Sequence, residues 1–135
     1  MGEDALAVTQ LAGLAGLEFH TGAPADATRI ALDALDQACD LENVGLCVWL
    51  LDFIAAFAVA ERPLEAVRVA GAADALRTAS GGGKRVEELH IEPARTAARR
   101  TLERGELEAA WTEGRGFELE RAIDEARSLR PVSIG

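Results

Sequence analysis

The stretch LAGLAGLEFHTGAPADATRIALDAL, residues 11–35, decides the fold. Apolar residues recur three and four positions apart on both sides of a Thr-Gly-Ala-Pro segment, which predicts two helices joined by a tight turn. Alanine occupies the positions where these helices would cross, at Ala15 in the first and at Ala27 and Ala34 in the second. Because a small side chain lets two helix axes approach closely, the stretch predicts a compact antiparallel hairpin.

The same small-residue pattern returns twice along the chain. It recurs as Ala66 with Ala70 and Ala73, and again as Ala98 with Ala110. We therefore predict a single all-α domain over residues 1–135, built from stacked antiparallel helical hairpins with about six to seven helices. The expected helices cover residues 6–20, 24–40, 44–60, 63–79, 93–104, 107–114 and 119–126, with Gly105 as a turn, residues 84–90 unassigned, and flexible ends at about 1–4 and 130–135.

The first hairpin also fits the tetratricopeptide pattern. Its packing positions fall on Leu11, Leu14, Ala15, Ala27, Ala31 and Ala34. The repeats are degenerate, because Ile54 stands where a small residue is usual and the repeat spacing exceeds the usual length of about 34 residues. We expect a degenerate tetratricopeptide-like solenoid whose ends leave apolar surface, and hence a homodimer or an adjoining domain of a longer chain.

Charge is distributed unevenly along the chain. Acidic residues outnumber Lys and Arg by 23 to 14, which gives a formal net charge of -9. The first 60 residues hold nine carboxylates and only Arg29 as a base, whereas the remainder is close to neutral. We expect no direct binding to nucleic acid or to an anionic membrane surface. The acidic half is then either a solvated outer face or a docking surface for a basic partner.

Cysteine and histidine usage predicts neither a metal site nor a structural disulfide. Cys39 and Cys47 flank a predicted helix-to-helix turn, where buried free thiols are the ordinary case. His20 and His90 are too far apart in sequence to complete a zinc site. The amino-terminal residues lack the features of a signal peptide, and the apolar stretch 44–60 is short and interrupted by Asp52, so we expect a cytoplasmic protein without a membrane span.

Several segments in the second half resemble a known family. They are Pro93–Arg95, Leu102–Arg115 and Leu119–Ile123, together with Val48–Asp52 and Ala66–Arg77. In this order they resemble the carboxyl-terminal tetratricopeptide-like region of LuxR-type and AfsR-like transcriptional regulators that carry an ATPase module. The resemblance implies a repeat region that receives partners or signals. It does not extend to the ATPase module or to a helix-turn-helix, and Glu118 replaces the usual capping Ser or Thr.

Two surfaces are candidate binding sites. A groove near Trp49, Phe53 and Phe57 is the expected place for a ligand or partner, although large aromatics at helical spacing more often pack in the core. Asp52, in the same apolar helix, is either a structural carboxylate or a perturbed general base. A basic run on the helix 93–104 forms a possible docking face or a set of surface ion pairs, with Arg95, Arg99 and Arg100 as its members.

These patterns favour a non-enzymatic interaction module that docks a protein or peptide. No residues combine into a catalytic or metal-binding arrangement, so we expect no cofactor. The segment Gly81–Lys84 does not have the spacing of a phosphate-binding loop. A small-molecule sensor that binds an effector between hairpins is the alternative, and an enzyme with scattered carboxylates is the third hypothesis.

Overall fold

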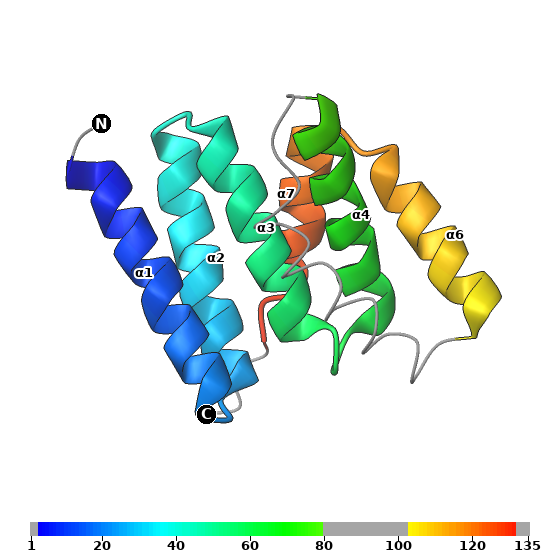
Figure 1. Cartoon of the computed structure of the whole chain (residues 1–135), viewed down its shortest axis with the longest axis horizontal. Helices are drawn as coiled ribbons and strands as arrows, with labels where there is room; N and C mark the ends of the chain where they lie inside the picture. The colour runs from blue at the N-terminus through cyan, green and yellow to red at the C-terminus, as the bar shows by residue number, and fades with distance from the viewer. Residues whose placement is uncertain (1–2, 80–102, 132–135) are drawn as a thin grey trace.

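The computed structural model describes residues 3–79 and 103–131, and within these ranges the chain is helical with no strand. Figure 1 shows the six helices of this part, which are α1 (Glu3–His20), α2 (Pro24–Asp40), α3 (Val44–Ala58), α4 (Pro63–Ala79), α6 (Arg104–Arg115) and α7 (Leu119–Arg127). The predicted all-α class is confirmed. The unassigned stretch 84–90, nearly all of the helix predicted over 93–104, and with it Ala98, lie outside the described residues.

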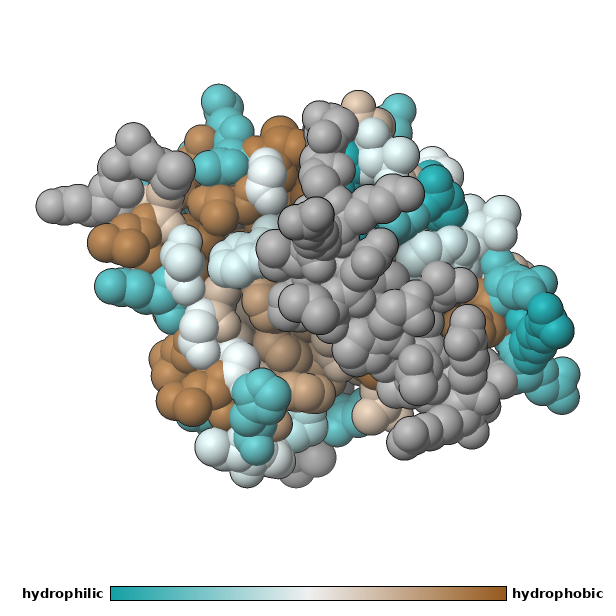
Figure 2. Space-filling view, in the orientation of Figure 1, coloured by the Kyte–Doolittle hydropathy of each residue, from teal (hydrophilic) through white to brown (hydrophobic). Residues whose placement is uncertain are grey.

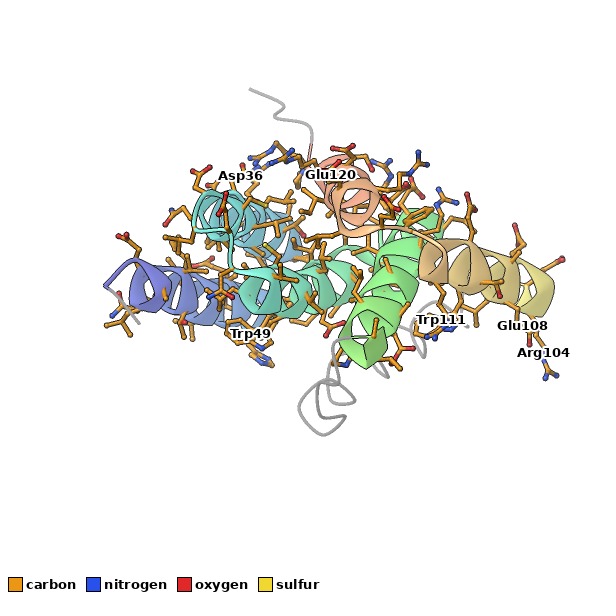
Figure 3. The ribbon with its side chains drawn as sticks, turned by 90° about the horizontal axis from the view of Figure 1, so that it is seen from above. Asp36, Trp49, Arg104, Glu108, Trp111 and Glu120 are labelled. Carbon is orange, nitrogen blue, oxygen red and sulfur yellow. The ribbon has the colours of Figure 1, made fainter. Side chains whose placement is uncertain are left out.

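Neighbouring helices pack against one another in chain order from α1 to α4, in the antiparallel manner that was predicted. After that the order changes, because α6 packs against α4 at the far end while α7 folds back onto α4 and α3. Seen from above, α1, α3, α4 and α6 form one layer, and α2 and α7 lie together on one side of it (Figure 3). The last helix, α7, therefore packs against the middle of the helix stack instead of extending it at one end.

The turn from α1 to α2 is a glycine-closed helix end. Gly22 has a φ of 91°, in the left-handed region that glycine adopts without steric cost. The N–H of Ala23 donates to the carbonyl of Glu18 at 2.9 Å, which is the long bond of a Schellman motif. Pro24 then occupies the first position of α2, as predicted, where a missing N–H has no consequence.

The turn from α2 to α3 uses the same motif without glycine. Glu42 takes the left-handed position with a φ of 54°, and the N–H of Asn43 donates to the carbonyl of Ala38 at 3.2 Å. The side chain of Asn43 accepts a hydrogen bond from the N–H of Leu46 at 3.1 Å. Asn43 is therefore the cap of α3.

The core is built from the predicted alanines with larger residues between them. Ala15, Ala27, Ala34, Ala66 and Ala73 are completely buried. The largest fully buried side chains come from the middle helices and include Leu32, Leu35, Leu50, Leu51 and Ile54. In the part of the chain that is described, no helix combines the length and the apolarity that crossing a membrane requires.

The outward face of α1 differs from the prediction. Leu14, expected to pack, is 45% exposed, and Leu6 and Leu17 are 58% and 60% exposed. The buried face carries Ala5, Val8, Ala12 and Ala15 instead. The helix is apolar on every side, so periodicity could not identify its inner face, and the close approach to α2 selected the small residues. Figure 2 shows the resulting hydrophobic surface at the α1 end of the molecule.

Helices α4 and α6 touch through their backbones at two glycines. A Cβ added at Gly71 would lie 2.5 Å from the carbonyl oxygen of Trp111, and one added at Gly114 would collide with the backbone of Arg68. Both glycines are buried inside their helices. Only residues without a side chain allow this crossing.

The predicted turn at Gly105 is wrong. Gly105 lies in the first turn of α6, which begins at Arg104, one residue after an extended Glu103. The N–H of Glu103 donates to Oε1 of Glu106 at 3.2 Å, as in a capping box. This cap fixes the start of the helix before the glycine, so the helix predicted to run to Arg104 cannot continue through Glu103.

Candidate functional site

Four aromatic rings form a continuous row across α3 and α1. Trp49 meets Phe53 edge-on with ring centroids 4.9 Å apart, and Phe53 lies 5.8 Å from Phe57. The last step crosses to α1, where the ring of Phe19 lies 4.9 Å from that of Phe57. We call Phe19, Trp49, Phe53 and Phe57 the aromatic row. Its three members on α3 are spaced by four residues, which places them on one face of the helix.

The aromatic row is buried at its centre and reaches the surface at its ends. Phe57 is only 5% exposed, whereas Phe19 is 37% exposed and Trp49 and Phe53 are half-buried. Trp49 lies on the side of the helix layer opposite α2 and α7, the side on which Trp111 also lies (Figure 3). The rings of Phe19, Trp49 and Phe53 therefore reach the surface in part, and contacts with neighbouring rings hold them in place.

Trp49, Phe53 and Phe57, the aromatic residues of the predicted groove, follow one another along α3, and Phe19 of α1 joins them without having been predicted to bind anything. Asp52, the fourth candidate in this helix, is buried against Arg77 and does not belong to the row. The groove itself stays a prediction. The contact between Phe19 and Phe57 depends on α1 lying next to α3. No local pattern in the sequence signals that contact, so it could not be predicted from spacing.

Asp52 belongs to a buried polar network that ties α3 to α4 and α6. Its Oδ2 accepts a hydrogen bond from Nη1 of Arg77 at 3.0 Å, and Nη2 of Arg77 donates to Asp74 at 3.1 Å. Asp74 also pairs with Arg115 of α6. Asp52 is 1% exposed and Arg77 is 6% exposed. These contacts, with a buried arginine side chain as a partner of Asp52, fit a structural carboxylate.

The acidic half of the chain finds basic partners in α7 and the residues after it. Arg127 lies 3.0 Å from Asp36, and Arg130 lies 3.4 Å from Asp33, with all four side chains exposed. These pairs connect the outer face of α2 to the end of the chain. Part of the acidic surface of α2 is therefore paired with arginines of the same chain. The predicted basic docking residues Arg95, Arg99 and Arg100 lie outside the described residues.

The two cysteines meet across the α2–α3 turn. Both are free, with Cys47 buried and Cys39 partly exposed, and their Sγ atoms are 3.9 Å apart. Burial, followed by the charge and hydrogen bond of Cys39, raises the pKa of the Cys47 thiol to about 12. Cys47 is therefore a neutral thiol at physiological pH.

No protein-family model, curated protein or solved structure matches this chain. The resemblance of residues 44–127 to LuxR-type and AfsR-like regulators stays a prediction.

Proposed function

We propose that this chain is a protein-binding module of a cytoplasmic transcriptional regulator and that the aromatic row is its docking surface. The observation that carries this proposal is the position of Trp49 and Phe53, which are half-buried and packed ring on ring. Aromatic anchors of this kind contribute most of the binding energy at protein interfaces. Because the neighbouring rings already hold them in place, little conformational entropy is lost when a partner binds.

The expected partner is a peptide that binds as an amphipathic helix with basic residues beside its apolar face. A helix presents anchors at every third or fourth residue, which suits a row of rings spaced by one turn. The first 60 residues carry nine carboxylates and a single arginine, so the net negative field of this half of the chain would attract a basic peptide, although Asp36 and the rest of α2 lie on the side opposite Trp49. The regulator context comes from the resemblance alone, which brings no ATP hydrolysis or promoter binding to this chain.

The exposed leucines of α1 support a second expected contact, with another copy of the chain. Leu6 and Leu17 are both well exposed, and a Cβ added at Gly13 between them would meet nothing within 4 Å. In a two-fold antiparallel pairing, Leu6 of each copy would face Leu17 of the other, and Gly13 would leave room for a close crossing. We propose a homodimer through this face, tested by sedimentation of the wild type against Leu17→Glu, which should be a monomer.

The docking proposal is tested by selecting helical peptides from a random displayed library against the full chain. The enriched peptides should carry apolar residues at helical spacing and bind with micromolar affinity, measured by the fluorescence anisotropy of dye-labelled peptide. Trp49→Ala should weaken this binding at least about tenfold, which is the effect expected for an anchor residue.

Two controls make the outcome decisive. Leu41→Ala removes an exposed apolar side chain that belongs neither to the aromatic row nor to the α1 face, and it should leave peptide affinity unchanged. Circular dichroism checks that Trp49→Ala keeps its helical content. The proposed docking surface would be overturned if Trp49→Ala left the affinity of the enriched peptides unchanged, or if the library yielded no enriched peptide.

A further inference from the structure

The only two cysteines of the chain are placed for reaction with each other. Cys39 lies in the last turn of α2 and Cys47 in the first turn of α3, on opposite sides of the three-residue turn 41–43. Their Sγ atoms, 3.9 Å apart, are about 2 Å farther apart than the sulfurs of a disulfide. A change of side-chain rotamer at one cysteine moves its sulfur by at least that much.

We propose that Cys39 and Cys47 form a redox-active dithiol, oxidised by a hydroperoxide to an intramolecular disulfide. This proposal is independent of the docking surface. The two residues differ in access, since Cys47 is 2% exposed whereas Cys39 is partly exposed. A hydroperoxide is small enough to reach a partly covered thiol, and Cys39 is the sulfur that it meets first.

The reaction balances in two steps. The Cys39 thiol releases its proton and its sulfur attacks one oxygen of hydrogen peroxide; the S–O bond forms, the O–O bond breaks, and the leaving hydroxide takes up that proton, which gives a sulfenic acid and water. The Cys47 sulfur then attacks the Cys39 sulfur, the S–S bond forms, and the S–O bond breaks to release hydroxide, which takes up the proton lost by Cys47. The two thiols lose two hydrogens and two electrons, and hydrogen peroxide is reduced to two molecules of water.

The surroundings favour a disulfide over a metal complex. Within residues 3–79 and 103–131, no group of three or more His, Cys, Asp or Glu side chains is placed to hold a metal ion. The pair also lies where a covalent link has a mechanical effect, because it joins the end of α2 to the start of α3 around a turn that contains the left-handed Glu42. The oxidised form should resist opening of this hairpin.

The test treats the reduced chain of 135 residues with hydrogen peroxide and then digests it under non-reducing conditions with a protease that cleaves after glutamate, which separates Cys39 from Cys47 at Glu42. We expect both thiols to disappear together, one peptide pair linked through Cys39 and Cys47, and full recovery with dithiothreitol. The melting temperature of the oxidised monomer should exceed that of the reduced one by about 5 °C, as expected for a short closed loop.

Single variants separate the two roles. In Cys47→Ala, Cys39 should stop at the sulfenic acid and be captured by dimedone, whereas in Cys39→Ala the buried Cys47 should stay reduced. Serine replacements serve the same purpose if an alanine variant loses helical content. Free thiols after peroxide treatment, links only between different chains, or a wild-type Cys39 that proceeds to sulfinic acid without a link would each overturn the proposal.

Discussion

Nη1 of Arg77 in α4 lies 3.0 Å from Oδ2 of Asp52 in α3, with both side chains almost completely buried. A buried ion pair of this kind ties two helices at one register, although its net stabilisation is small because both charges lose their hydration. Removing one member is far more damaging than removing both, since the remaining charge stays in the core.

This asymmetry gives the first prediction. Asp52→Ala should lower the free energy of unfolding by about 3 kcal/mol, measured by urea denaturation, because the Arg77 guanidinium loses its buried carboxylate. The double change Asp52→Leu with Arg77→Met should return to within about 1 kcal/mol of the wild type. Asp36→Ala, which breaks the exposed pair with Arg127, is the control and should cost at most about 1 kcal/mol. A double variant as unstable as Asp52→Ala would contradict this interpretation.

The second prediction concerns the crossing of α4 and α6. Gly114→Ala should destabilise the protein by about 2 kcal/mol, because its Cβ would collide with the backbone of Arg68 and force the helices apart. Gly105→Ala in the same helix is the matched control, since its Cβ meets nothing within 4 Å. There the higher helix propensity of alanine should raise stability by up to about 1 kcal/mol. Thermal unfolding of both variants checks this, and equal shifts would show that the crossing is not tight.

The two Schellman turns give a third prediction with opposite signs. Glu42→Gly should stabilise the protein by about 0.5–1 kcal/mol, because glycine adopts the left-handed conformation without steric cost. Gly22→Ala should destabilise it by about 1 kcal/mol for the same reason. Chemical denaturation of both variants is the measurement. Shifts of the same sign would mean that backbone strain does not control these turns.

Local signals account for the part of the fold that could be predicted. Pro24 marks the start of α2 by its missing N–H and Asn43 marks the start of α3 by its side-chain oxygen, and the buried alanines follow from helical spacing. The prediction failed at Gly105, where two local signals compete. The capping contact between Glu103 and Glu106 starts the helix before Gly105, although glycine favours a turn. Choosing between these two signals requires their free energies, which the sequence pattern does not supply.

The candidate site was less predictable because its contacts join distant parts of the chain. The α3 members of the aromatic row follow from four-residue spacing, but Phe19 joins them only because α1 and α3 lie side by side. The pairing of Asp52 with Arg77 likewise needs the register of α3 against α4. Periodicity identifies which face of a helix is buried, but it does not identify the helix that packs against that face.

The fourth prediction uses the pKa of Cys47, which burial and the neighbouring Cys39 raise from 9.0 to about 12. Above pH about 9 the unfolded chain releases the thiol proton while the folded chain retains it, so folding stability falls as pH rises from about 9 towards 12. Below pH about 9 this contribution is fully present. Cys47→Ala removes the group, so its stability should decline less steeply than that of the wild type between about pH 8 and pH 10.5.

Urea unfolding at several pH values, with a phosphine reductant present to keep both thiols reduced, measures this difference. Ser128→Ala, a change in an exposed residue after α7, serves as the control and should follow the wild-type slope. Parallel pH profiles for the wild type and Cys47→Ala would mean that Cys47 titrates alike in the folded and unfolded chain, which its burial at the end of the α2–α3 hairpin argues against.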